Sequence, residues 1–193
     1  MVKTNINLFA EGEVVYTDGG VLAEFAWILV VLPFIAALII TFVGKSLPLK
    51  GAEVALGTIG IIFIYSLALM YLHVTEGVAN EFFINVGNIG QFDIEFGWVV
   101  DGLSIMMYFV VGLVALLVFI YATNYMEGEI RYTFFFTSLT LFAGSMLVLV
   151  SSPTLIQILI GWELVGVCSY LLIGHYWEVK DNSSAAMKAF ITN

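Results

Sequence analysis

The sequence has 193 residues, of which 61% are hydrophobic and 11% are charged. Soluble domains carry about 25% charged residues, so an apolar excess of this size cannot be hidden in the core of so short a chain. The formal net charge of −9 argues against nucleic acid as a partner, because phosphate binding needs clustered Lys and Arg. The single cysteine, Cys168, excludes an internal disulfide and reads as a small packing residue. The composition predicts an integral membrane protein for which lipid is part of the solvent.

Residues 1–24 are polar and acidic, with Glu11, Glu13, Asp18 and Glu24. They lack the basic start and short apolar run of a secretory signal peptide. We therefore expect a polar N-terminal segment that lies on the outer face of the membrane, ahead of the first spanning helix.

Five apolar windows are long enough to cross a bilayer as helices, which takes about 20 mostly apolar residues. Strands of a membrane barrel would alternate in polarity, and these windows do not. A sixth apolar pattern begins near Ala185. The predicted fold is all-α, with transmembrane helices one and two in residues 25–74, helices three to five in 103–174, and a cytoplasmic loop and the start of a sixth helix in 175–193. The five windows cover residues 25–44, 54–74, 103–123, 133–151 and 154–174.

The second connection, residues 75–102, contains five carboxylates and no Lys or Arg. Two short apolar or alternating runs flank Gly87, Asn88 and Gly90, which favours a β-hairpin on the outer face. The alternative is an irregular loop that dips into the membrane interface through Phe82, Phe83 and Trp98.

Basic residues fall on alternate connections between the predicted helices. Lys45 and Lys50 flank the first connection, Arg131 lies in the third, and Lys180 and Lys188 follow the fifth helix. The positive-inside rule then places the N-terminus outside and the end of the fifth helix in the cytoplasm of an inner or cytoplasmic membrane.

Glu163 is the one carboxylate in the middle of a predicted helix; the other acidic residues fall in connections or near helix ends. A carboxylate at the centre of a spanning helix costs about 2.5–3.5 kcal/mol, and such groups usually face a bundle interior or a wet cavity. Burial raises the proton affinity of a carboxyl group, and a nearby cation lowers it. We therefore expect Glu163 to be buried near the middle of the membrane as a proton relay. A protonated glutamate that joins helices by hydrogen bonds is the alternative.

Two further residues are candidates for a proton path. Tyr170 lies seven residues after Glu163, on the same helix face, and offers a hydroxyl. Lys188 enters the sixth helix from the cytoplasmic side, where it could line an entrance or extend harmlessly to the interface.

His73 and His175 fall at helix ends and are expected to meet the interface. The sequence contains no haem, zinc, iron–sulfur or phosphate-binding pattern, so we expect no cofactor and no metal in this chain.

Several motifs resemble a known family. They are FGWVVDGLS at 96–104, Tyr121, the NYM of 124–126, Ser145-Met146, GWELVGVCSYLLIG at 161–174 and AAMKAFITN at 185–193. These stretches are similar to the L subunit (chain 5) of respiratory complex I, the proton-translocating NADH–quinone oxidoreductase, which is related to the large subunits of sodium/proton antiporters. The stretch at 161–174 is the most specific of them.

The resemblance implies that Glu163 matches a membrane glutamate that pairs with a lysine on a later helix, and that Lys188 matches a basic position at the start of helix six. Phe119 and His175 stand where relatives often have His and Phe. Members of the family are much longer, so the chain is expected to be an N-terminal part.

The resemblance also implies a membrane-arm subunit that takes part in proton translocation coupled to quinone reduction. Flavin and iron–sulfur clusters are then expected in partner subunits, and the other membrane-arm subunits and lipid are the expected partners. A subunit of a sodium/proton antiporter and a purely structural membrane scaffold are the alternatives.

Overall fold

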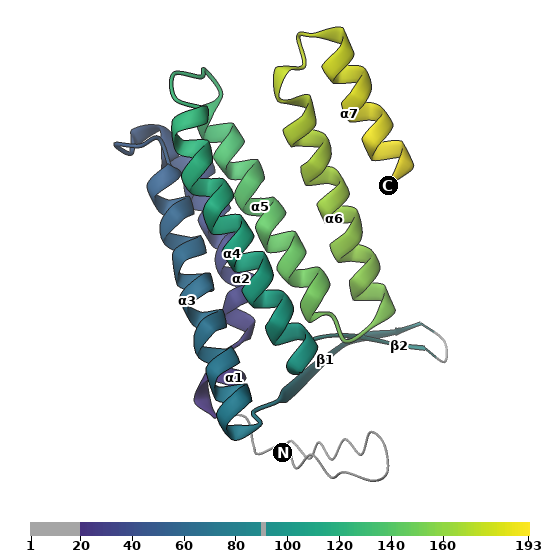
Figure 1. The fold of residues 1–193 in the computed structure, drawn as a ribbon. Helices are drawn as coiled ribbons and strands as arrows, with labels where there is room; N and C mark the ends of the chain where they lie inside the picture. Colours follow the sequence, from purple (N-terminus) through teal and green to yellow (C-terminus); the bar gives the residue numbers. More distant parts are fainter. Residues whose placement is uncertain (1–19, 90–91) are drawn as a thin grey trace.

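A computed structural model describes residues 20–89 and 92–193 and shows long antiparallel helices with a β-hairpin at one end (Figure 1). Five of the described helices are long and apolar enough to cross a membrane, which confirms the predicted all-α membrane fold. The prediction for residues 1–24 falls mostly outside the described residues. The helices are α1 (Val21–Glu24), α2 (Trp27–Val43), α3 (Ala52–Glu76), α4 (Gly102–Tyr125), α5 (Tyr132–Ser151), α6 (Leu155–Ile173) and α7 (Lys180–Thr192), with 3-10 turns at Gly44–Ser46 and Gly174–Tyr176.

Polar side chains and glycine set the ends of three long helices. The Asp101 carboxylate accepts a hydrogen bond from the backbone N–H of Ser104 (2.7 Å) and caps α4. The Thr154 hydroxyl caps α6 in the same way, through the N–H of Gln157 (3.4 Å). Gly77 ends α3 with a φ of 66°, in the left-handed region that glycine adopts without strain.

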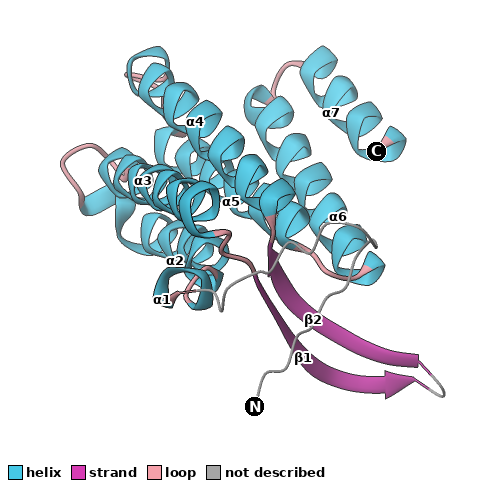
Figure 2. Cartoon of the chain, turned by 60° about the horizontal axis from the view of Figure 1, so that its bottom comes forward, coloured by secondary structure: helices cyan, strands magenta, loops and turns pink. Residues whose placement is uncertain are grey.

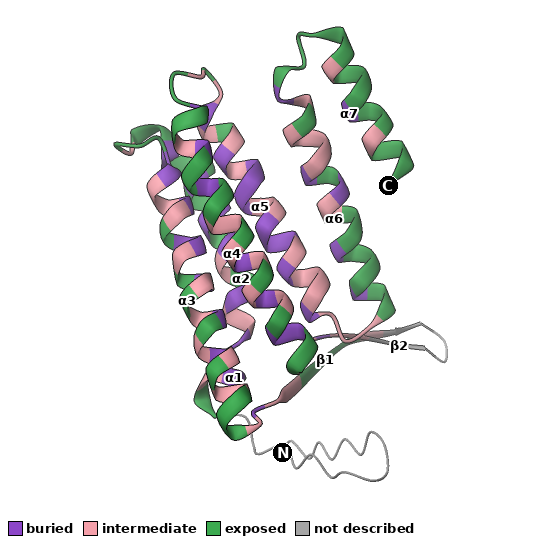
Figure 3. Ribbon diagram, viewed as in Figure 1, coloured by how far each residue is buried: buried purple, intermediate pink, exposed green. Residues whose placement is uncertain are grey.

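Helix α5 is the central element, because it packs against α2, α4 and α6. Helix α3 closes the other side of the bundle by packing against α2 and α4. Helix α6 packs extensively against two helices only among the described elements, α5 and α7. Figure 3 shows the result: α5 is mostly buried or half-buried, whereas α6 carries long exposed stretches. Among the five spans α6 has the smallest buried share.

The second connection is a β-hairpin, as predicted. Strands β1 (Asn80–Ile89) and β2 (Phe92–Val100) pair in antiparallel register from Asn80↔Val100 to Ile89↔Phe92, with an irregularity between Asn85 and Gly87. The ring of Phe82 stacks on that of Trp98 at 4.4 Å between centroids. The hairpin extends away from the helix ends to one side of the bundle (Figure 2).

Helix α7 begins at Lys180, five residues before the apolar pattern suggested. Its first turns are polar, but Ala186 is buried, and the helix folds back along α6 (Figure 1). The side of α7 that contacts α6 is therefore narrow, and it begins within the polar first turns of α7.

Candidate functional site

Glu163 lies in the middle of α6, eight residues after Leu155 and thus about 12 Å along the helix axis. Within the described membrane-length helices it is the one Asp, Glu, Lys or Arg that is remote from both ends of its helix. Its position along the membrane span therefore agrees with the prediction from the sequence.

The predicted burial of this carboxylate is wrong for the described chain, because Glu163 is exposed. Gly161 and Cys168 mark the side of α6 that packs on α5, and Gly166 marks the side that packs on α7. Glu163 lies between these two contacts, where no other described element covers the helix. Among the described residues its carboxylate has no hydrogen-bond or ion-pair partner.

The exposed residues around Glu163 on this face of α6 are apolar. Spacings of three, four and seven residues place them on the same side of the helix. All of them are exposed: Ile156, Leu159, Ile160 and Val167. A single carboxylate thus stands in the middle of an apolar surface, which we call the Glu163 face.

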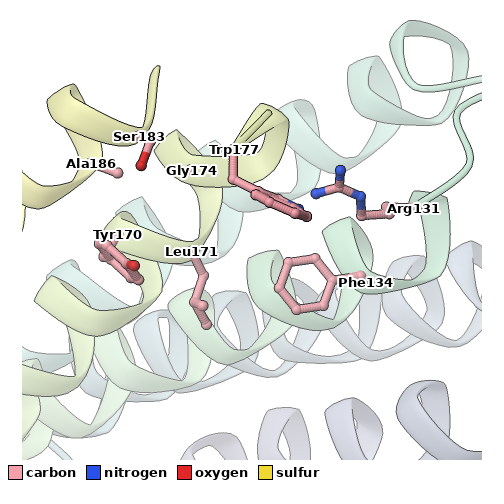
Figure 4. A pocket seen from close by; sticks show the side chains of 8 residues that line it. All are labelled: Arg131, Phe134, Tyr170, Leu171, Gly174, Trp177, Ser183 and Ala186. Carbon is pink, nitrogen blue, oxygen red and sulfur yellow. The ribbon is translucent and has the colours of Figure 1, made fainter. Parts of the chain in front are cut away.

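Tyr170 lies on the same side of α6 as Glu163, two turns later, and is half-buried because its ring packs on Phe190 of α7 at 5.7 Å between centroids. It also lines a cavity of about 310 Å³ between α5, α6 and the start of α7. Figure 4 shows the Tyr170 ring, the Ser183 hydroxyl and the Trp177 indole around this cavity. The cavity is lined by Arg131, Phe134, Tyr170, Leu171, Gly174, Trp177, Ser183 and Ala186.

Lys188 is exposed and lies away from α6. Ala186 faces α6 and is buried, and a residue two positions later is turned by about 200° around the helix. The structure therefore brings Tyr170 to α7 but does not bring Lys188 to Glu163.

Arg131 closes one side of the cavity and joins the α4–α5 connection to the end of α6. Its guanidinium donates to the backbone carbonyl of His175 (2.7 Å) and forms an ion pair with Glu178. The same group lies 5.5 Å from the centroid of the Trp177 ring, in a cation–π contact.

His175 is buried rather than at a wet interface, which differs from the expectation. Its ring packs edge-on against Phe135 (5.5 Å) and Tyr176 (4.9 Å), and its Nδ1 has no hydrogen-bond partner. The position at a helix end did not reveal this, since burial comes from aromatic residues of α5.

Gln157 is the polar residue that sequence reasoning missed. It is 6% exposed, and its amide exchanges two hydrogen bonds with the backbone of Gly97 in β2. A signal was present, because an amide within an apolar helix needs a partner. Among the described residues no group of three or more His, Cys, Asp or Glu is arranged to hold a metal ion.

Two family descriptions match the chain. Residues 87–136 match "NADH-Ubiquinone oxidoreductase (complex I), chain 5 N-terminus", and residues 152–193 match "NADH:quinone oxidoreductase/Mrp antiporter, TM". NAD(P)H-quinone oxidoreductase chain 5 of Synechocystis sp. is 39% identical over 179 residues, which is 89% of this chain and 26% of that protein. The chain 5 protein of Picosynechococcus sp. is 38% identical over 180 residues, 89% of this chain and 27% of that protein.

Over most of its length the chain is similar to the chain 5 proteins of complex I. It spans about a quarter of the length of the chain 5 proteins it matches. A solved archaeal respiratory membrane complex, the membrane-bound sulfane sulfur reductase, contains a similar chain with a TM-score of 0.71 and 13% identity, over 87% of this chain and 34% of that one. At this identity the likeness shows that the fold is shared, and nothing more.

Proposed function

We propose that this chain is part of a membrane-arm subunit of a complex I-like NADH–quinone oxidoreductase and takes part in proton translocation coupled to quinone reduction. Glu163 is the carboxylate that gains and loses the proton. The chain handles no electrons itself, and flavin and iron–sulfur clusters belong to partner subunits. The similarity to the chain 5 proteins supports this proposal.

The observation that carries the proposal is the position of Glu163 in the middle of an apolar, exposed surface of α6. An ionised carboxylate against acyl chains is costly, about 2.5–3.5 kcal/mol at a helix centre. Surfaces of this kind are therefore covered by protein or water in the assembled state. The chain covers about a quarter of these relatives' length, so protein segments like those outside the matched part of the relatives are the proposed cover of the Glu163 face.

Such a cover would supply a cation beside the carboxylate, which none of the described residues does. A cation lowers the proton affinity of a carboxyl group, and its withdrawal raises that affinity again. Tyr170 is the proposed next member of the path, because it lies on the same side of α6 as Glu163 and lines the cavity beside Arg131. Lys188 is the weaker proposal, since its side chain lies on the far side of α7.

The proposed setting is an inner or cytoplasmic membrane with the N-terminus and the hairpin outside. Lys45, Lys50, Arg131 and Lys180 all lie at the opposite end of the bundle, which the positive-inside rule assigns to the cytoplasm. The other membrane-arm subunits and lipid are the proposed partners.

Replacement of Glu163 tests the function in the complete membrane complex. Glu163→Gln keeps the shape of the side chain and removes its ability to ionise, so it should abolish or strongly lower the number of protons pumped per electron. Glu163→Asp should retain part of it. Glu178→Gln is the matched control, because it removes a carboxylate at the helix end. Normal pumping by Glu163→Gln would refute the proposal.

A subunit of a sodium/proton antiporter is a second candidate, because the description that matches residues 152–193 names both kinds of protein. Purification of the native complex separates the two. Flavin and iron–sulfur absorbance that co-purifies with the chain supports the oxidoreductase, and sodium-dependent proton exchange in a complex without these groups supports the antiporter.

A scaffold without proton handling is favoured by one observation, the lack of any polar partner of Glu163 among the described residues. The Glu163→Gln measurement decides this case as well, since a scaffold would assemble and pump normally with glutamine at this position.

A further inference from the structure

The amide of Gln157 occupies the outer edge of the hairpin. The backbone N–H of Gly97 donates to Gln157 Oε1 at 2.9 Å, and Gln157 Nε2 donates to the Gly97 carbonyl at 2.8 Å. Both backbone groups of Gly97 therefore point away from β1 and towards α6. A strand edge normally leaves such groups unpaired, and here one side chain pairs them both.

Few side chains could replace this amide. A carboxamide offers an acceptor and a donor at the same end, whereas an aliphatic side chain offers neither and an ionised carboxylate offers acceptors alone. Gln157 and Gly97 are both buried, so loss of the pair would leave an N–H and a carbonyl without water or partner.

Two neighbouring contacts make the junction rigid. The Thr154 hydroxyl donates to the carbonyl of Glu95 at 3.2 Å, one turn before Gln157 on the same side of α6. One turn after Gln157, Gly161 lies against the backbone of α5. A single stripe of α6 is thus fixed to the hairpin at one level and to α5 at the next.

This stripe determines where Glu163 faces. Gln157 and Glu163 are separated by about 9 Å along the axis and by about 120° around it. A slip of α6 by one residue turns the helix by about 100°, which would carry the carboxylate from the Glu163 face into the contact with α5 or α7. Apolar packing alone resists such a slip weakly, because α6 is apolar on several sides.

We propose that Gln157 is a positioning residue for the Glu163 carboxylate, which it holds in orientation by pairing with Gly97 at the edge of β2. This inference rests on the proposed function of Glu163. Through this pair the hairpin fixes the rotation of α6 about its axis. Displacement of the strand edge therefore turns α6 and changes the surroundings of the Glu163 carboxylate.

The test uses three variants in the complete membrane complex. Gln157→Leu removes both hydrogen bonds at similar volume. Gln157→Glu provides a carboxyl that can accept from Gly97 N–H at any pH but donates to the Gly97 carbonyl only while protonated. Ser169→Ala is the control, because it removes a hydroxyl of α6 whose hydrogen bond goes to Val165 within the same helix (2.8 Å).

The quantity measured is the number of protons pumped per electron as a function of pH. Gln157→Leu should move the midpoint of this profile by about one pH unit, a tenfold change in proton affinity. Gln157→Glu should follow the wild type at acid pH and Gln157→Leu at alkaline pH. Ser169→Ala should keep the wild-type midpoint.

A Gln157→Leu complex that assembles and keeps the wild-type midpoint overturns the inference. If that variant does not assemble, a Gln157→Glu profile that follows the wild type at every pH overturns it equally. Failure of the proposed function looks different, because Glu163→Gln would then pump normally. When Glu163→Gln stops pumping while both Gln157 variants leave the midpoint unchanged, the positioning role alone is refuted.

Discussion

Gly161 of α6 lies directly against the backbone of Leu149 in α5. A Cβ atom at Gly161 would stand 2.9 Å from Leu149 Cα and 3.0 Å from its nitrogen, closer than such atoms approach. The glycine therefore sets the distance between the helix that carries Glu163 and the central helix of the bundle. Since α6 has few other neighbours, this contact is a main support of the site.

Gly161→Ala is expected to destabilise the chain by about 1–3 kcal/mol, because backbone on both helices must move to admit the methyl group. Gly57→Ala in α3 is the matched control. It meets open space and should be neutral or stabilising by about 0.5–1 kcal/mol. Thermal unfolding of the purified complex in detergent measures both, and an equal shift of Tm in the two variants would contradict the close contact.

Gly97→Ala should open the hairpin. Its Cβ would lie closer than 2 Å to the carbonyl oxygen of Phe82, so the two strands cannot keep their pairing. Hydrogen exchange of the β1 and β2 amides should accelerate, and the hydrogen bonds to Gln157 should be lost. Gly87→Ala, which meets nothing within 4 Å, should leave exchange at the Gln157 junction unchanged.

Arg131→Gln should weaken the junction between the α4–α5 connection and the end of α6 by about 1 kcal/mol. It removes an ion pair with Glu178, a hydrogen bond to the His175 carbonyl and the contact with the Trp177 ring. Glu178→Gln should have a smaller effect, since Glu178 is largely exposed and the other two contacts remain. Chemical unfolding of the two variants compares them, and equal losses would mean that the ion pair alone matters.

The Glu81 carboxyl should make stability depend on pH. Burial raises the pKa of Glu81 above its ordinary value, and the charge of Asp101 raises it further. Because the folded pKa is the higher one, the contribution of this group is present below the unfolded pKa and is lost as pH rises through the folded pKa.

Glu81→Gln should therefore raise Tm at neutral pH and have little effect at acid pH, where the wild-type carboxyl is protonated. Measurement of Tm over this pH range tests the statement. A neutral-pH Tm that falls on substitution would show that the ionised carboxylate is stabilising instead.

The membrane fold could be predicted from the sequence because its cause is local. Each spanning helix is an apolar run of bilayer length, and the hairpin follows from short apolar runs around Gly87 and Asn88. The sequence predicts the start of α7 near Ala185, five residues too late. The first turns of the helix, from Lys180, are polar and carry no hydropathy signal.

The surroundings of the site could not be predicted, because they depend on which helices meet. The position of Glu163 along α6 follows from counting residues, but its exposure depends on the absence of a described neighbour on that side. The burial of His175 depends on Phe135 of another helix, and the partner of Gln157 lies 60 residues away in β2. Long-range contacts of this kind leave no trace in the local pattern.

Infrared difference spectroscopy of the working complex tests the protonation of Glu163 most directly. If this carboxylate carries the proton, turnover should produce a change in the carboxylic-acid C=O band, and that change should disappear in Glu163→Gln but persist in Glu178→Gln. An identical difference spectrum in wild type and Glu163→Gln would show that Glu163 keeps one protonation state during turnover and has no part in moving protons.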